Sequence, residues 1–150
     1  TFSPSLKRLS IGGHHGTGNK VMELLPESLG NLSNLEELSL DKCKSLKALP
    51  QSIGKLHKLR SLNMRECKCV PTLPPSIVNC PLVEISLSKC IELTSLPCNM
   101  DQWTLLEDLV LTKCKNISTL PDALGNCKNL AWIDLRACKK LESLPESIGQ

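Results

Sequence analysis

Nine cysteines carry the widest range of possible chemistry in this 150-residue chain, because thiols form disulfides, bind metals and act as nucleophiles. Five of them recur at intervals of 23 or 24 residues: Cys43, Cys67, Cys90, Cys114 and Cys138. Side chains that project in parallel from stacked segments hold their Cβ atoms too far apart for a disulfide. The spacing therefore favours small apolar side chains in a core, and it predicts free thiols in a reducing compartment.

The other four cysteines fall into two pairs. Cys80 and Cys127 replace leucine at a repeated position, so we expect them to be buried in the core. Cys69 and Cys98 occupy positions of the repeat that should be exposed, and they are the candidates for reactive thiols.

A polar, glycine-rich stretch near the N-terminus, GGHHGTGNK, invites two further interpretations. A phosphate-binding loop needs Gly-Lys followed by Ser or Thr, whereas here Asn19 separates Gly18 from Lys20. His14 and His15 are adjacent, so their side chains point in different directions, and no cysteine or acid has ligand spacing to them. The stretch is interpreted as a loop between repeats, and we expect no metal, no cofactor and no enzymatic activity.

A repeat must position all of these residues. Leu-Pro pairs begin 23 or 24 residues apart, at Leu25, Leu49, Leu73, Leu96, Leu120 and Leu144. Between them the chain follows LPxSIGxLxxLxxLxLxxCxxLxx, and the eight non-Pro apolar positions are apolar in all five complete repeats. Apolar and polar residues alternate around the later leucines, which predicts short strands. Their expected centres are Leu9, Leu38, Leu62, Ile85, Leu109 and Ile133.

One repeat cannot bury its own leucines, whereas stacked repeats can. The sequence predicts an α/β solenoid of about six repeats, with a curved parallel sheet on the concave face and short helical or 3₁₀ turns on the convex face. We expect a single domain over residues 1–150. It comprises a divergent repeat with a loop insertion at 1–24, where His14 takes the place of the recurring cysteine, five regular repeats at 25–143, and a truncated sixth at 144–150. Because both ends interrupt a repeat, we expect a fragment of a longer chain.

The convex half of the repeat gives three finer predictions. Serines after the Leu-Pro pairs, such as Ser52 and Ser76, should bond to local backbone. Glycines such as Gly30 and Gly54 should lie where the turn bends back. The third repeat has lost one residue and carries Val78 in place of glycine, which predicts a tighter and less helical convex segment.

These motifs resemble the leucine-rich repeats of plant intracellular immune receptors of the nucleotide-binding type. The resemblance is carried by LPESLGNLSNLEELSLDKCKSLKALPQSIG and its later copies, with Leu-Pro at the turn and cysteine in the recurring position. Extracellular receptor kinases resemble this chain less, because they carry Asn there and a Gly-x-Ile-Pro turn. The resemblance implies recognition of a pathogen effector or a host signalling protein, restraint of the receptor's own nucleotide-binding domain, and a cytoplasmic or nucleocytoplasmic location. The alternative is an intracellular scaffold of the Ras-group leucine-rich-repeat type, whose repeats usually keep Asn.

The residues around the strand leucines vary while the scaffold residues do not, which is typical of a binding surface. Residues entering the strands are mostly acidic, and those flanking the recurring cysteines are mostly basic. The net charge of +3 gives no indication of nucleic-acid binding, and no apolar run has the length of a membrane span. Trp103 replaces a core leucine, whereas Trp132 should be exposed on the concave face or packed sideways on a neighbouring repeat. The candidate protein-binding residues are Arg60, Arg65, Glu84, Glu107, Asp108, Trp132, Asp134 and Arg136.

Overall fold

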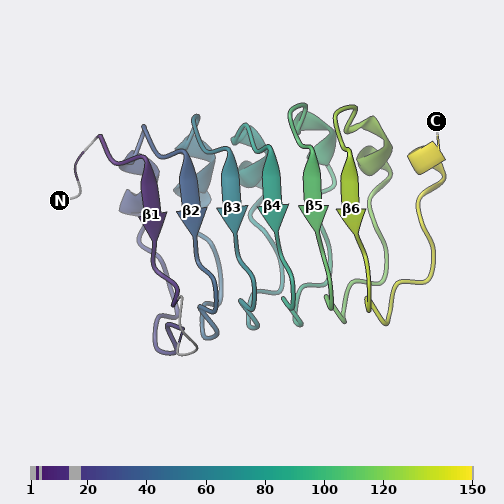
Figure 1. Ribbon diagram of the computed structural model, residues 1–150, viewed down its shortest axis with the longest axis horizontal. Helices are drawn as coiled ribbons and strands as arrows, with labels where there is room; N and C mark the ends of the chain where they lie inside the picture. Colours follow the sequence, from purple (N-terminus) through teal and green to yellow (C-terminus); the bar gives the residue numbers. More distant parts are fainter. Residues whose placement is uncertain (1–2, 4, 14–17, 150) are drawn as a thin grey trace.

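The strands form one parallel sheet in chain order (Figure 1). The structure, a computed structural model, describes residues 3, 5–13 and 18–149, so His14 and His15 lie outside the described residues. The six strands of the described part are β1 (Arg8–Ser10), β2 (Glu37–Ser39), β3 (Ser61–Asn63), β4 (Glu84–Ser86), β5 (Asp108–Val110) and β6 (Trp132–Asp134). Their central residues pair in register from Leu9 to Ile133. The predicted strand centres and the single parallel sheet are confirmed.

Short 3₁₀ helices return the chain from one strand to the next and lie behind the sheet (Figure 1). They are η1 (Glu27–Asn31), η2 (Gln51–Lys55), η3 (Pro75–Asn79), η4 (Met100–Gln102), η5 (Asp122–Asn126) and η6 (Glu146–Gly149). Proline directly precedes four of them in an extended conformation, as Pro26 does at φ −72° and ψ 149°. Proline suits such a helix start because the first amides of a helix have no partner within it. The predicted 3₁₀ turns are therefore present.

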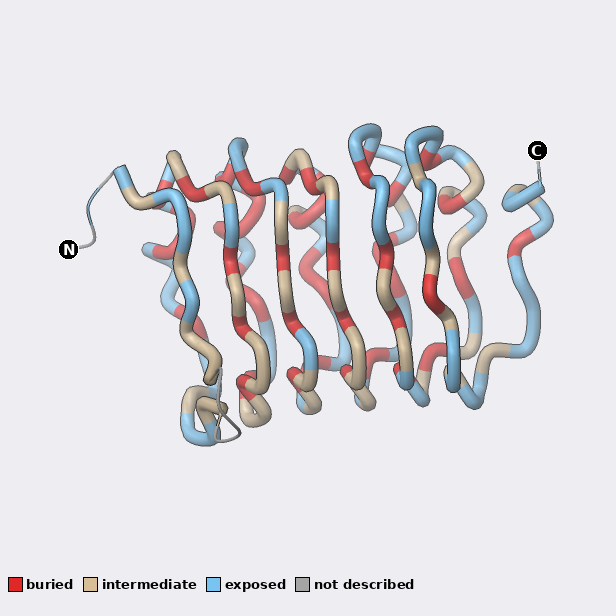
Figure 2. The backbone as a smooth tube through the Cα atoms, in the orientation of Figure 1, coloured by how far each residue is buried: buried red, intermediate tan, exposed pale blue. Residues whose placement is uncertain are grey.

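The hydrophobic core is a column between the sheet and the 3₁₀ helices (Figure 2). In the four repeats that begin at Leu25, Leu49, Leu73 and Leu96, all eight apolar positions are buried. In the repeat that contains β6, five of the eight apolar positions are only partly buried, namely Leu130, Ile133, Leu135, Cys138 and Leu141. Within the described part, β6 has a neighbouring strand on one side only. Burial in this fold therefore depends on the repeats on both sides.

Backbone hydrogen bonds after each strand tie one repeat to the next. The N–H groups of Leu40 and Lys42 donate to the carbonyl oxygens of Asn63 and Arg65, both at 2.7 Å. The residue before each recurring cysteine is left-handed, with φ between 60° and 64°: Lys42, Glu66, Lys89, Lys113 and Ala137. That conformation costs a non-glycine residue about 1–2 kcal/mol. The backbone hydrogen bond to the next repeat offsets this cost at the four inner positions, and Lys113 makes it to Arg136 at 2.8 Å.

The recurring cysteines, here called the cysteine ladder, also donate hydrogen bonds. Each thiol from Cys67 to Cys138 donates to a carbonyl oxygen of the preceding repeat, as Cys67 Sγ does to Leu40 at 3.2 Å and Cys114 Sγ to Leu87 at 3.0 Å. Burial raises the pKa of Cys67 and Cys114 to about 12. The thiols are free, as predicted. The prediction that all five ladder cysteines are buried is wrong for Cys138, which is half-buried because it belongs to the repeat of β6.

One prediction about the convex side is wrong, because its polar contacts run between repeats. Ser76 does not bond within its own turn, since its Oγ donates to the carbonyl of Gln51 in the preceding repeat at 2.7 Å. Gly30 is required by close approach, because a Cβ there would lie 2.5 Å from the carbonyl oxygen of Ser52. Its conformation is not left-handed.

The third repeat also differs from its prediction. Its helix η3 spans five residues, the same length as η1 and η2, and the shortest inner segment is η4 with three. The lost residue is absorbed after the helix, where Cys80 is extended and Leu82 N–H donates to the Cys80 carbonyl at 2.8 Å. The prediction of a less helical convex segment in the third repeat is therefore wrong, because Val78 is accommodated as a buried residue.

Leu62→Ala tests the column. Leu62 is 1% exposed at the centre of β3, so the change should lower the free energy of unfolding by about 2–5 kcal/mol in urea denaturation. Because contacts run between neighbours, hydrogen exchange should accelerate mainly in the adjacent repeats. Leu105→Ala, at a side chain that is 41% exposed, is the matched control. Equal losses in the two variants, or uniform loss of protection along the chain, would contradict the column.

Alkylation under native conditions tests the thiols. Cys69 and Cys98 are exposed and should react first, whereas Cys67 and Cys114 should react only after local opening, because their raised pKa leaves almost no thiolate at neutral pH. Cys138 should react at an intermediate rate. Mass spectrometry of peptides at successive times gives the order, and early labelling of Cys67 would show that the ladder is accessible.

Candidate protein-binding surface

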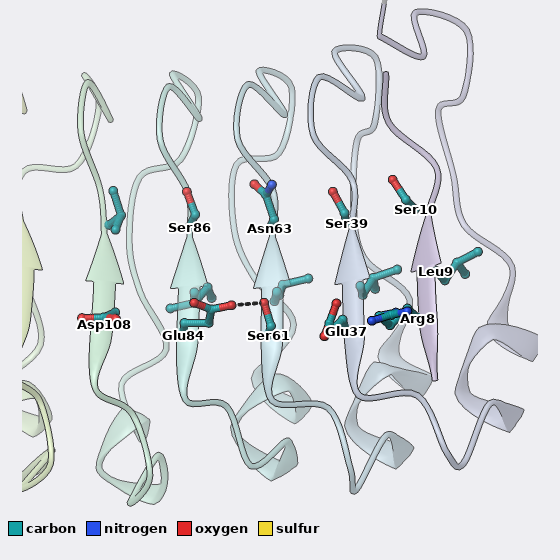
Figure 3. A pocket seen from close by; sticks show the side chains of 14 residues that line it. Arg8, Leu9, Ser10, Glu37, Ser39, Ser61, Asn63, Glu84, Ser86 and Asp108 are labelled. Atoms are coloured by element: carbon teal, nitrogen blue, oxygen red, sulfur yellow. Dashed lines mark hydrogen bonds between the residues drawn. The ribbon is translucent and has the colours of Figure 1, made fainter. Parts of the chain in front are cut away.

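In β2 to β5 the first and third residues are exposed or half-buried on the open face of the sheet, while the central residue is buried in the core. Because the strands are in register, these residues form two rows across the repeats (Figure 3). The first row is Arg8, Glu37, Ser61, Glu84, Asp108 and Trp132. The second row is Ser10, Ser39, Asn63, Ser86, Val110 and Asp134. We call these two rows the sheet face.

A hollow of about 560 Å³ lies over the sheet face from β1 to β5. Of the predicted site residues, Glu84 and Asp108 line it (Figure 3). The other polar residues that line this hollow belong to the variable positions around the strand leucines, which were predicted to form a binding surface, but they were not among the eight candidate residues: Arg8, Ser10, Glu37, Ser39, Ser61, Asn63 and Ser86. The available signal was the repeat itself, since aligned positions of successive repeats become neighbours once strands stack in register.

The first row concentrates negative charge at Glu84 and Asp108, whereas Glu37 has Arg8 as its register partner on β1. Glu84 and Asp108 are register partners on adjacent strands, and like charges directly opposite each other are destabilising. The Ser61 hydroxyl donates a hydrogen bond to the Glu84 carboxylate (Figure 3). Among the described residues, no cationic side chain forms an ion pair with Glu37, Glu84 or Asp108. This row therefore presents carboxylates that a cationic partner can neutralise.

Asp134 and Arg136 form an ion pair at the end of β6. Arg136 donates to the Asp134 carboxylate from its guanidinium, at 2.6 Å to Oδ2 and 3.0 Å to Oδ1, and from its backbone N–H at 3.0 Å. These hydrogen bonds hold the pKa of Asp134 well below its usual range. Asn63 accepts the Arg65 N–H in the same way at 3.0 Å. Asp134 is buried, so it shapes the turn, and the exposed group of this pair is the guanidinium.

The two tryptophans occupy opposite environments. Trp103 is buried, and its indole N–H donates to the Ile77 carbonyl at 3.3 Å. Trp132 is 57% exposed and lines a second hollow at the C-terminal end with Leu124, Ile133 and Ile148. Trp132, Asp134 and Arg136 therefore lie on or beside one strand, as the sequence suggested, whereas their role in binding stays a prediction.

The three remaining predicted residues lie beside the sheet face. Arg60 and Glu107 precede β3 and β5, and each backbone carbonyl accepts two N–H groups of the following repeat at 2.8–3.1 Å. Their side chains are exposed. Arg65 follows β3, with its guanidinium 3.8 Å from Glu66. The eight predicted residues are thus distributed over the hollow, the end of β6 and the two margins of the sheet.

The side chains that bind metals do not cluster in the part of the chain that the structure describes. Within residues 3, 5–13 and 18–149, no group of three or more His, Cys, Asp and Glu side chains could hold a metal ion. In the same part of the chain, no helix is long and apolar enough to cross a membrane.

Fluorescence quenching tests the placement of the tryptophans. Trp132→Phe should remove the emission that acrylamide quenches readily and change the free energy of unfolding by less than about 0.5 kcal/mol, because the side chain is largely exposed. Trp103→Phe should instead cost about 1–3 kcal/mol, because the smaller ring leaves unfilled space in the core and the Ile77 carbonyl keeps only the Cys80 N–H as a donor. Readily quenched emission from the Trp132→Phe protein would contradict the burial of Trp103.

Comparisons with known proteins agree with this geometry. The family described as R13L1/DRL21 LRRs matches residues 2–67, which is less than half of the chain. No curated protein matches the sequence. The leucine-rich repeat domain of the type III effector XCV3220 (XopL) is 25% identical with a TM-score of 0.54, over 85% of this chain and 53% of that one. The plant peptide hormone receptor RGFR1, solved in complex with RGF2, is 21% identical with a TM-score of 0.56, over 96% of this chain and 28% of that one.

This chain therefore spans about half the length of the effector domain and a smaller share of the receptor. The in-register parallel sheet, the 3₁₀ turns and the buried leucine column agree with both similarities. Together they show that the chain is a leucine-rich repeat solenoid, a module of protein–protein recognition.

Proposed function

We propose that this chain is the ligand-sensing and autoinhibitory leucine-rich repeat region of a plant intracellular immune receptor of the nucleotide-binding type. Three observations support the proposal: the Leu-Pro turns, the cysteine ladder and the match of the N-terminal part to the R13L1/DRL21 repeats. In this proposal the chain works in the cytoplasm or nucleocytoplasm. Its partner is a pathogen effector, a host signalling protein or the receptor's own nucleotide-binding domain.

The observation that carries the proposal is that the residues within each strand have two different roles, packing and display. The central residue is apolar in every repeat and packs into the column, and the backbone ties each repeat to the next. The first and third residues change from repeat to repeat and contribute little to that packing. A rigid scaffold that displays variable side chains is what recognition of a protein surface requires.

Within this surface the contacts have distinct roles. Glu84 and Asp108 lie together in the hollow and attract a basic side chain of the partner. Trp132 supplies an exposed aromatic anchor at the start of β6, and Arg136 supplies an exposed guanidinium after the end of this strand. Trp and Arg are enriched among interface hot spots. Arg60, Arg65 and Glu107 at the margins of the sheet orient the partner.

The test is charge reversal in the full-length receptor. Glu84→Lys/Asp108→Lys should weaken binding of the repeat region to its nucleotide-binding domain by about 10-fold or more, because two attractive contacts become repulsive. Release of a fluorescent nucleoside diphosphate from that domain should accelerate in parallel. Both quantities are measured on purified protein whose melting temperature has been compared with that of the wild type.

The matched control is Glu92→Lys/Glu142→Lys, which makes the same charge change at exposed turn residues away from the sheet face. It should leave both quantities within twofold. Equal effects of the two double variants would show that the sheet face does not bind the nucleotide-binding domain. A full-length protein without a nucleotide-binding domain would favour a Ras-group-type scaffold.

A further inference from the structure

Six lysines line the edge of the solenoid formed by the turns that follow the strands, at the bottom of Figure 1. Four of them directly follow a ladder cysteine in their own repeat, and the other two flank these positions. We call this set the lysine edge: Lys44, Lys68, Lys113, Lys115, Lys139 and Lys140. Lys44 and Lys68 are half-buried, and the other four are exposed.

The lysine edge has no close carboxylate partner within the described part of the chain, and Glu66, which pairs with Lys89, attracts only Lys44 among the six. Other cations of the same turns have carboxylate partners, as Lys89 has Glu66 at 2.7 Å and Lys47 has Glu23 at 2.6 Å. Across residues 3, 5–13 and 18–149, none of the six lysines forms an ion pair. Glu92 and Glu142 are the carboxylates of these turns that also lack one, so the unpaired charge of the edge remains positive.

The acidic row of the sheet face does not neutralise the edge either. Asp108 begins β5, whereas Lys113 lies in the turn that follows this strand, so the length of the strand separates the two charges. Among the described residues, no ion pair joins an acid of the first row to a lysine of the edge. The acidic row and the lysine edge therefore act as two separate surfaces.

The backbone presents these charges at fixed intervals. Lys113 N–H donates to the carbonyl of Arg136 in the next repeat at 2.8 Å, and the neighbouring Cys114 is buried in the column. Strands of a sheet are about 4.8 Å apart, so Lys44 to Lys139, four repeats later, covers about 19 Å. An extended segment of about six residues has the same length at 3.3 Å per residue. The lysines thus form a file along the edge, interrupted at Ile91 in the third repeat, and the length of this file matches a short extended chain.

We propose that the lysine edge is a second protein-binding surface, which binds an extended segment rich in Asp and Glu. A nucleic acid fits this edge less well, because single-strand sites combine basic residues with aromatic stacking. Trp103 is buried and Trp132 lies at the start of β6, so neither described tryptophan is available there. This proposal does not depend on the receptor role, because it rests on charges away from the sheet face.

The experiment measures binding of a labelled glutamate dodecapeptide to the 150-residue chain by fluorescence anisotropy, at about 50 mM salt where exposed charges are weakly screened. Lys115→Gln/Lys139→Gln should weaken binding by about 3- to 10-fold, since each exposed ion pair contributes a small factor. The control is Lys55→Gln/Lys128→Gln, which removes the same charge from two exposed lysines elsewhere. It should stay within twofold of the wild type, and circular dichroism should show all three proteins folded.

Three outcomes would overturn the proposal. The first is no measurable binding of the peptide by the wild-type chain. The second is an equal loss in the two double variants, which would mean that net charge alone attracts the peptide. The third is tighter binding of an oligothymidylate of the same length, or of phosphatidylserine vesicles, with the loss confined to Lys115→Gln/Lys139→Gln, which would assign the edge to nucleic acid or to a membrane surface.

Discussion

Hydrogen bonding between successive repeats is the constraint on which the rest of this structure depends. A strand of three residues is too short to be stable alone, and its polar groups need partners about one repeat away. The bonds from Leu40 to Asn63 and from Cys67 to Leu40 both span one such interval. A change in repeat length must then be absorbed before the next strand begins. The one-residue loss in the third repeat is absorbed at Cys80 and Leu82, and β4 keeps its register.

The cysteine ladder serves packing and hydrogen bonding together. The carbonyls of Leu40, Met64 and Leu87 each accept two hydrogen bonds, one from the backbone N–H of the ladder cysteine in their own repeat and one from the thiol of the ladder cysteine in the next. A thiol is small and largely apolar, and it still donates a weak hydrogen bond. Desolvation raises the pKa of these thiols, so they remain neutral donors at physiological pH. Asparagine would offer stronger donors but would bury a more polar side chain.

Features that depend on one repeat could be predicted from the sequence, and features that depend on its neighbour could not. Strand centres such as Leu62 follow from local alternation, and all six were found as expected. The bond of Ser76 to Gln51, the close approach at Gly30 and the exposure of Cys138 all involve a second repeat. The candidate site shows the same limit. Their positions in the repeat identified its residues, but the register brings Glu84 beside Asp108 and leaves Arg60 at the margin.

The residues that stabilise the fold are not the residues that it exposes, and this explains how the solenoid carries opposite charges on nearby surfaces. Stability between β4 and β5 comes from Ile85 and Leu109 in the core and from the backbone bonds around them. Repulsion between Glu84 and Asp108 above those residues is therefore a small term, since exposed charges in water interact weakly. The same holds for the lysines beside the buried cysteines. Because neither surface contributes to the column, substitutions can alter either one at little cost to the fold.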